Sequence, residues 1–310
     1  MRVVFLGTPD FAVPSLQALA AAHDVVAVFT QPDRPKGRGN QLAQSPVKQA
    51  ALALRIPVHQ PDRIRHAENL EVLRGLSPDL MVVVGYGQII PQSLIDLPPH
   101  GILNVHASLL PKYRGAAPIQ WAIARGETRT GVTIMQIDAG LDTGDMLLAE
   151  LVNIEPDETA PELSGRLAFL GAELLIKALC HIAEGTVIRT KQDAASATLA
   201  PILRKEDGQI DWKLPAATIY NRLRGFTPWP GAYTMFRKNK LLIWRAQPHG
   251  DMHLAPGELR VEKKRLWAGC GEASALELLE LQPAGKSRLT VEAFLNGYPL
   301  SNNEKLGEHF

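Results

Sequence analysis

The sequence predicts an α/β protein with two domains: an open, mostly parallel, Rossmann-like sheet covered by helices, and then a small β-barrel. Three observations support this class. The first half alternates short apolar runs with longer amphipathic segments, which is typical of a parallel sheet packed between helices. The segment that follows residue 183 loses helical periodicity and becomes extended and polar. From about residue 205, short strand-like runs are broken by turn signals at the spacing of a small barrel.

The strands of the first domain are predicted from runs of apolar and β-branched residues. These runs are Val3–Leu6, Asp24–Thr30, Leu80–Val84, Gly101–His106 and Gly131–Gln136. A helix is expected from the Phe11 region to Ala22, so the first two strands and this helix form one βαβ unit. Ligands of open α/β sheets bind beyond the carboxyl ends of strands, so polar residues at those ends carry most functional weight.

The domain boundaries are predicted from the loss of this pattern. The amphipathic helix Leu163–Ala183 closes the first domain, which we expect to span residues 1–186. Residues 187–204 are predicted to be an interdomain linker, and residues 205–310 the second domain. The strand-like runs of the second domain are Leu241–Trp244, Leu259–Val261 and Leu289–Val291.

The composition excludes several classes of protein. The 310 residues are 45% apolar and 21% charged, so the chain is neither fibrous, collagenous nor disordered. The net charge of +1 gives no global reason to expect nucleic acid or anionic membranes as partners, and any basic patch must be local. The charge is modestly uneven, since residues 205–310 carry a balance of +3 and residues 1–204 a balance of −2.

Cysteine use and hydropathy indicate the compartment. Cys180 and Cys270 form neither a disulfide framework nor a paired metal site, which fits a reducing environment, the cytosol by default. The apolar N-terminal run meets Gly7 too early for a signal peptide, and no stretch approaches the ~18 apolar residues of a membrane span. We expect a cytoplasmic protein that does not cross a membrane.

Nucleotide and metal sites are not expected. The first strand is followed by Gly7-Thr8-Pro9, which has one glycine where a dinucleotide fingerprint needs three, and a proline where backbone N–H groups should approach a pyrophosphate. The nine histidines do not cluster at metal-ligand spacing. We predict neither a nicotinamide or flavin cofactor nor a catalytic metal.

The densest polar stretch at a strand end begins with Asn104 and His106. Two residues apart on a strand, they point to the same side, so that an amide donor for an oxyanion and an imidazole for proton transfer converge. Asp142 follows the 131–136 strand, and a parallel sheet would bring it to the same edge, where its carboxylate favours the charged imidazole. From the residues alone, satisfied turn residues at a strand end are an equally good interpretation.

A long segment, residues 31–42, is predicted to be a loop because it contains two prolines, two glycines and three basic residues. The basic residues are Arg34, Lys36 and Arg38. A solvated charged turn and a functional loop are both compatible with this composition.

Several of these motifs together closely resemble the methionyl-tRNA formyltransferase family. The resemblance rests on segments distributed over nearly the whole chain, namely residues 7–11, 31–35, 104–115, 115–121, 131–136 and 221–232. The core around Asn104, His106, Asp142 and Ser108-Leu109-Leu110-Pro111 is shared by folate-dependent formyltransferases in general, so it indicates the reaction better than the acceptor. The 34–42 loop, residues 115–121 and the C-terminal domain resemble the tRNA-specific members.

The resemblance implies formyl transfer from 10-formyltetrahydrofolate to the α-amino group of methionyl initiator tRNA, without a covalent enzyme intermediate. It implies a formyltransferase catalytic domain with Asn104, His106 and Asp142 as catalytic residues, and Ser108, Leu109, Leu110 and Pro111 as the folate-binding segment. It also implies that Arg34, Lys36 and Arg38 contact tRNA, with Arg38 at the key basic position. The second domain would be an OB-like barrel, whose Lys238, Lys240, Arg245, Lys263, Lys264 and Arg265 are candidates for contacts with the tRNA backbone.

Two other functions stay open at this level. A formyltransferase acting on a small amine would share the catalytic core but would need neither the basic loop nor the barrel. A nonenzymatic RNA-binding protein on a retired enzyme scaffold is disfavoured because Asn104, His106 and Asp142 are all present. We expect a monomer, as in the family, since no heptad or exposed apolar stripe is evident.

Overall fold

The computed structural model describes residues 1–36, 41–250, 252–301 and 304–307, with the backbone alone at 36 and 41. The chain divides into two compact units. The first comprises Met1–Pro118, Arg129–Asn153 and Leu163–Pro201, and the second comprises Ile119–Thr128, Ile154–Glu162 and Ile202–Phe310. Each unit is therefore assembled from several stretches of sequence.

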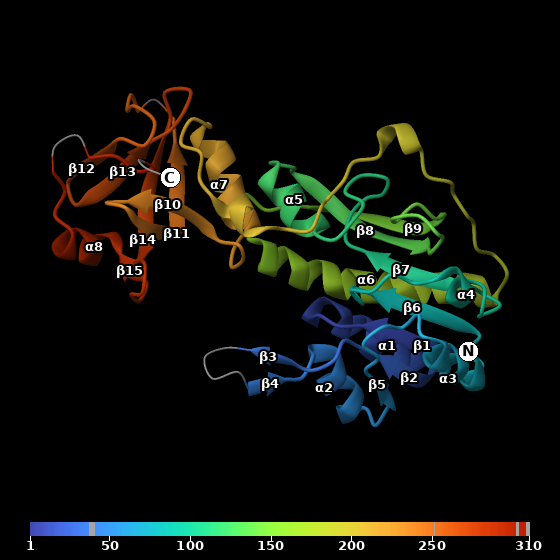
Figure 1. The fold of residues 1–310 in the computed structure, drawn as a ribbon. Helices are drawn as coiled ribbons and strands as arrows, with labels where there is room; N and C mark the ends of the chain where they lie inside the picture. Colours follow the sequence, from blue (N-terminus) through green and yellow to red (C-terminus); the bar gives the residue numbers. More distant parts are fainter. Residues whose placement is uncertain (37–40, 251, 302–303, 308–310) are drawn as a thin grey trace. The chain divides into compact units, whose positions relative to one another are not determined.

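The first unit is built on a seven-stranded sheet with helices on both faces (Figure 1). Its strands are β1 (Arg2–Gly7), β2 (Asp24–Phe29), β5 (Val58–His59), β6 (Leu80–Val84), β7 (Ile102–His106), β8 (Arg129–Gln136) and β9 (Met146–Asn153). The helices that begin in it or run through it are α1 (Val13–Ala22), α2 (Pro46–Ala53), α3 (Ala67–Leu76), α4 (Gln92–Ile95), α5 (Pro118–Ala124) and α6 (Ala160–Ala183).

The strand order is β5-β2-β1-β6-β7-β8-β9. The pairs from β5 to β7 are parallel, as expected, whereas β8 is antiparallel to both β7 and β9. The prediction that the 131–136 strand joins in parallel was therefore wrong. The carboxyl end of β8 lies beside the start of β7, with Gln136 opposite Leu103, and the loop after β8 has to return along the sheet to bring Asp142 to the site.

The two faces of the sheet are covered differently, and this difference orients β7. Ile64, Leu73 and Leu94, the last two from α3 and α4, pack with alternate residues of β1 and β6 in one buried cluster. On the other face α6 comes so close that a Cβ on Gly171 would lie 2.7 Å from Val105 Cγ1. Because side chains alternate along a strand, Asn104 and His106 face away from α6.

The segment predicted as a loop at residues 31–42 contains a short antiparallel ribbon. Strands β3 (Arg34–Lys36) and β4 (Gln41–Ala43) pair with Arg34 opposite Ala43. The ribbon is followed by α2, whose start is encoded locally: Ser45 Oγ accepts a hydrogen bond from Lys48 N, and Pro46 occupies the first helical turn. The prolines and glycines predicted a loop, and the pairing of β3 with β4 was not predicted.

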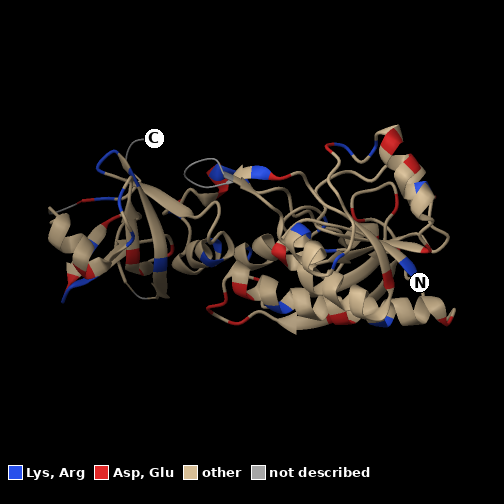
Figure 2. Ribbon diagram, turned by 90° about the horizontal axis from the view of Figure 1, so that it is seen from below, with Lys and Arg blue, Asp and Glu red and all other residues tan. Residues whose placement is uncertain are grey.

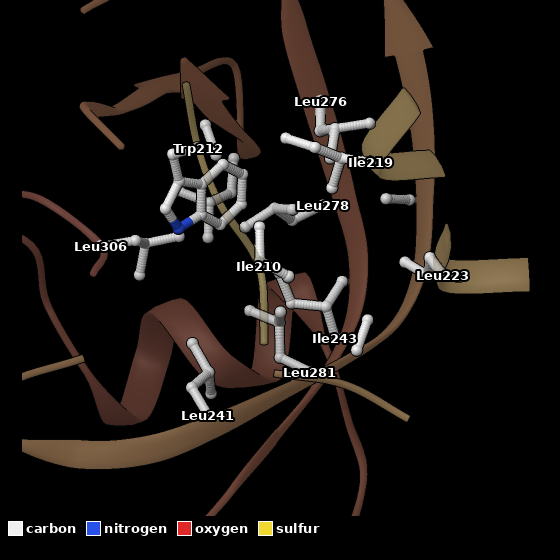
Figure 3. Close-up of a cluster of buried hydrophobic side chains, with 14 of the residues drawn as sticks. Ile210, Trp212, Ile219, Leu223, Leu241, Ile243, Leu276, Leu278, Leu281 and Leu306 are labelled. Carbon is white, nitrogen blue, oxygen red and sulfur yellow. The ribbon is translucent and has the colours of Figure 1, made fainter. Parts of the chain in front are cut away.

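The second unit holds a six-stranded antiparallel sheet in the order β10-β11-β14-β13-β12, with β15 on β14. Its strands are β10 (Ala232–Phe236), β11 (Asn239–His249), β12 (Leu259–Glu262), β13 (Arg265–Gly269), β14 (Ala275–Pro283) and β15 (Leu289–Thr290), and its own helices are α7 (Ala216–Gly225) and α8 (Val291–Gly297). Of the predicted strand 289–291, the last residue begins α8 instead. Figure 3 shows the core of this unit, where Trp212 and Leu306 lie among buried aliphatic residues of α7, β11 and β14.

The end of the chain connects the two outer strands of this sheet. Leu306 N donates to Gly257 O at 2.8 Å, just before β12, and Gly307 N donates to Met235 O of β10 at 2.9 Å. Arg237, after β10, also pairs with Glu304. These contacts complete an antiparallel, barrel-like second unit.

The segment predicted as a linker, residues 187–204, is hydrogen-bonded into the first unit over much of its length. Thr190 pairs with Met146, and Arg114 forms a parallel bridge to Leu199.

Lys and Arg residues are interspersed with Asp and Glu residues along the ribbons of both units (Figure 2). In the part of the chain that is described, no helix is long and apolar enough to cross a membrane.

Candidate active site

Asn104 and His106 lie on the same side of β7, as their spacing on a strand predicts, and both reach Asp142. Asn104 Nδ2 donates to Asp142 Oδ1 at 3.4 Å, and His106 Nδ1 lies 3.7 Å from Asp142 Oδ2. His106 is buried, with 5% of its surface exposed, and the side chain of Asp142 is partly buried, with 17% exposed. Three side chains able to move protons and donate hydrogen bonds therefore converge in a small, largely desolvated volume.

The orientation of the imidazole is fixed by a backbone carbonyl. His106 Nε2 lies 2.9 Å from Tyr113 O. A carbonyl oxygen can only accept, so Nε2 must carry a hydrogen and donate it. The other ring nitrogen, Nδ1, faces the Asp142 carboxylate. Nδ1 is therefore the ring nitrogen that remains for chemistry.

Asp142 lies on the loop between β8 and β9, and its backbone is left-handed, with φ of +51°. An Asp tolerates this region better than most residues. Its Oδ2 accepts a hydrogen bond from Gly115 N at 2.8 Å. The carboxylate is thus held between a backbone amide on one side and the two β7 side chains on the other.

The segment Ser108-Leu109-Leu110-Pro111 turns directly after β7, and its polar groups are occupied within the unit. Ser108 Oγ donates to Lys112 O at 2.6 Å, while Thr133 Oγ1 donates to Ser108 O at 2.7 Å and accepts from Leu110 N at 3.1 Å. Leu109 and Pro111 are half-buried. The accessible part of this turn is mainly apolar.

The base of the β3–β4 ribbon is anchored by a partly buried ion pair. Lys48 Nζ donates to Asp33 Oδ2 at 2.6 Å and to Gln60 Oε1 at 2.7 Å, and Gln60 Nε2 donates to Asp33 Oδ1 at 2.8 Å. The hydrogen bond from Lys48 is the main cause of a lowered pKa of Asp33. Arg34 is exposed on β3, whereas the Lys36 side chain and all of Arg38 lie outside the described residues.

The basic residues of the second unit are less available than their number predicts. Arg245 pairs with Glu280 at 3.0 Å, Lys264 with Glu292 at 3.0 Å and Arg265 with Glu277 at 2.6 Å. Lys240 lies 3.7 Å from the centroid of the Tyr233 ring, and burial lowers its pKa. Lys238 and Lys263 sit at left-handed positions in the β10–β11 and β12–β13 turns.

Three residues around the site were not found from the sequence. Tyr113 supplies the carbonyl for His106, Gly115 the amide for Asp142, and Gln192 donates to the backbone of the Asp142 loop. Tyr113 and Gly115 act through backbone groups, which leave little trace in residue type. Gln192 lies in a segment that reads as a polar linker, so only the folded structure shows its neighbours.

No group of three or more His, Cys, Asp or Glu residues that could hold a metal ion occurs within the described ranges.

Comparison with known proteins identifies both parts of the chain. The model of the family described as "Formyl transferase" matches residues 1–179, and that described as "Formyl transferase, C-terminal domain" matches residues 202–299. A methionyl-tRNA formyltransferase of Solibacter usitatus (strain Ellin6076) is 59% identical over 310 residues, 99% of each chain. One of Koribacter versatilis (strain Ellin345) is 58% identical over 309 residues, again 99% of each.

A solved structure extends the likeness of fold. WlaRD, a sugar 3N-formyl transferase determined in the presence of dTDP and 5-N-formyl-THF, matches with a TM-score of 0.69 and 19% identity, over 93% of this chain and 99% of its own. At this identity the likeness concerns the fold alone.

Proposed function

Because the chain belongs to the methionyl-tRNA formyltransferase family, and so formylates methionyl initiator tRNA with a formyl-tetrahydrofolate donor, we propose that Asn104, His106 and Asp142 carry out the transfer. The observation that carries this proposal is the placement of His106 Nδ1, which faces the Asp142 carboxylate at 3.7 Å while Nε2 is bound to Tyr113 O. The donor, 10-formyltetrahydrofolate, supplies the formyl group and takes back a proton on its N10 nitrogen.

Asn104 stabilises the negative charge that forms on the formyl oxygen as the amine adds. Its Nδ2 has two hydrogens, and the 3.4 Å contact with Asp142 Oδ1 engages one of them weakly. The second hydrogen is left to donate to the oxyanion. Removing one such donor from an enzyme costs about 10²–10³-fold in turnover.

His106 and Asp142 handle the protons. One amine proton must leave and the leaving nitrogen must gain one, so a group that both accepts and donates is required. Since Nε2 is committed to the Tyr113 carbonyl, Nδ1 would give its hydrogen to N10 of the folate and regain one from the amine, so that the ring ends as it began. His106 would also help to stabilise the oxyanion.

The 108–111 turn and the β3–β4 ribbon are proposed to hold the two substrates. Leu109, Leu110 and Pro111 would contact the folate through apolar surface, with Ser108 shaping the turn through its bond to Lys112 O. Arg34, Lys36 and Arg38 would contact tRNA phosphates, which position a nucleic acid without reading its sequence. We also propose that the enzyme is a monomer and works in the cytoplasm, where translation initiation consumes its product.

Single-turnover formylation tests these roles, with methionyl initiator tRNA and 10-formyltetrahydrofolate both at saturation. We expect Asn104→Ala and His106→Ala to lower the rate by about 10²-fold or more, with thermal unfolding little changed. His100→Ala, an exposed histidine before β7, is the matched control and should react as the wild type does. Full activity of either site variant would remove the role assigned to that residue.

Arg34→Ala and Arg38→Ala test the proposed tRNA contacts. Loss of a phosphate contact should raise the KM for methionyl-tRNA, leave turnover at saturation unchanged, and lower the dependence of log KM on log salt by about one unit. Formylation of a small amine in place of tRNA would contradict the role of the ribbon.

A further inference from the structure

We propose that Gln192 is a positioning residue for Asp142, and that it keeps the carboxylate aligned with the reactive nitrogen of His106. The inference rests on the catalytic roles proposed above, because it concerns how one of those residues is held.

Gln192 fastens the loop that carries Asp142. Its Nε2 donates to the carbonyl oxygens of Asp142 at 2.9 Å and of Gly144 at 2.8 Å. Both hydrogens of the amide are therefore used on one short stretch of loop. Asp142 adopts a left-handed backbone there, with φ of +51°, so the turn benefits from a fixed external contact.

Arg114 orients the side-chain amide of Gln192. Arg114 donates to Gln192 Oε1 twice, from Nε at 3.0 Å and from a terminal nitrogen at 2.7 Å. Guanidinium groups only donate and carbonyls only accept, so these neighbours leave one orientation of the Gln192 amide. Charge-assisted, two-point contacts of this kind are also among the stronger hydrogen bonds.

These contacts close a ring around Asp142. Gly115, the next residue after Arg114, donates its N–H to Asp142 Oδ2 at 2.8 Å. Arg114 is therefore linked to Asp142 in two ways. The amide of the next residue, Gly115, binds the Asp142 carboxylate, and Gln192, which Arg114 binds, donates to the Asp142 backbone carbonyl. Asp142 is held at its side chain and at its carbonyl by one connected set of groups, although Gln192 touches no proposed reacting atom.

Loss of the Gln192 side chain should therefore lower the rate of the chemical step without weakening substrate binding. Without the Gln192 amide, the carbonyls of Asp142 and Gly144 and the Arg114 guanidinium lose a hydrogen-bond partner. The loop that carries Asp142 can then move. A displacement of about 1 Å at a catalytic group can cost about 10²-fold in rate. The chemical step should slow, while the affinities for tRNA and folate, which depend on other surfaces, should stay nearly unchanged.

The test is a double-mutant cycle on the full-length protein, with single-turnover rates and both KM values measured for Gln192→Ala, Asp142→Asn and the double variant. We expect Gln192→Ala to lower kcat by about 10- to 100-fold with each KM within about twofold of wild type. If Gln192 acts through the carboxylate, adding Gln192→Ala to Asp142→Asn should cost nothing further. Asn is used at position 142 because it tolerates the left-handed backbone.

Two more variants separate positioning from simple packing. Gln192→Glu keeps an acceptor for Arg114 but removes both donors to the carbonyls, so it should be at least as slow as Gln192→Ala. Asp193→Ala, in the same segment, only loses bonds within its own turn and should keep the wild-type rate.

The outcomes distinguish the two levels of the argument. Wild-type activity of Gln192→Ala or of Gln192→Glu, or losses that multiply in the double variant, would overturn the positioning role while leaving the catalytic role of Asp142 intact. Wild-type activity of Asp142→Asn would instead overturn the proposed function, and the positioning role with it.

Discussion

Replacing Gly115 with alanine should damage the site through the backbone alone. Gly115 has φ of +118°, a conformation that L residues rarely adopt, and an added Cβ would lie 2.7 Å from the Ala200 carbonyl oxygen. Because the neighbour is backbone, the chain itself must shift. The amide that would move is the one that donates to Asp142 Oδ2 at 2.8 Å.

The size of the effect follows from these two contacts. Strain at such a position costs about 1–3 kcal/mol. A weakened hydrogen bond to a charged group adds about 1.5–3 kcal/mol. A total of about 4 kcal/mol lowers the melting temperature of a domain of this size by about 8–16 °C, at roughly 2–4 °C per kcal/mol. Displacement of Asp142 should also reduce single-turnover formylation by about 10²-fold.

Gly185→Ala is the matched control for Gly115→Ala. Gly185 has φ of +69°, but nothing lies within 4 Å of a Cβ placed there. It therefore carries the cost of a left-handed alanine, about 1 kcal/mol, without a clash and without a bond to the site. Calorimetry and the formylation assay should show a small loss of stability and normal activity for Gly185→Ala. Equal behaviour of the two variants would refute the reasoning.

Three further predictions concern stability. Lys48→Met should lower the free energy of unfolding at pH 6, because Lys48 lowers the pKa of Asp33 in the folded protein. The stability that ionised Asp33 contributes is present above the ordinary carboxyl pKa of about 3.9. It is lost as the pH falls through the lowered pKa of the folded protein. Urea titrations of Lys48→Met and the wild type should therefore converge below about pH 4. Tyr86→Phe should gain about 1 kcal/mol in urea unfolding, since the buried Tyr86 hydroxyl finds no hydrogen-bond partner among the residues described, and a loss of stability would indicate a partner. Leu306→Ala should cost about 2–4 kcal/mol in unfolding of the second unit, because Leu306 is 4% exposed in its core, and a cost below about 1 kcal/mol would show that the chain end does not complete that unit.

The sequence predicted those parts of the fold in which local pattern and tertiary environment agree. β6 matches its predicted bounds, and β1, β2, β7 and α6 match within a few residues, because buried strands and long amphipathic helices carry a repeated signal. β9 and β14 were not predicted. In β9 most side chains are at least partly exposed, and its Met, Leu, Ala and Glu residues favour a helix rather than a strand.

The direction of β8 shows a different limit. Its residues predict a strand, but parallel and antiparallel pairing use the same residue types, and only the connection decides between them. The connection from β7 to β8 includes α5, which suits a parallel crossover, yet the two strands are antiparallel. Asp142 was therefore assigned to the right neighbours for the wrong geometric reason: the loop after β8 brings it back along the sheet.

The proposed catalytic residues differ in how their positions are encoded, and this difference explains which of them the sequence could reveal. Asn104 and His106 are fixed by β7, whose alternation makes their spacing visible in the sequence. Asp142 is on a loop, where no periodicity fixes a side chain, so its position depends on hydrogen bonds from residues 27 and 50 positions away. Those bonds come from a glycine amide and from the Gln192 side chain in an extended segment, which by composition looks like a linker. Because the Asp142 loop lacks a strand's rigidity, substitutions at Gly115 and Gln192 should alter turnover more than their ordinary residue types predict.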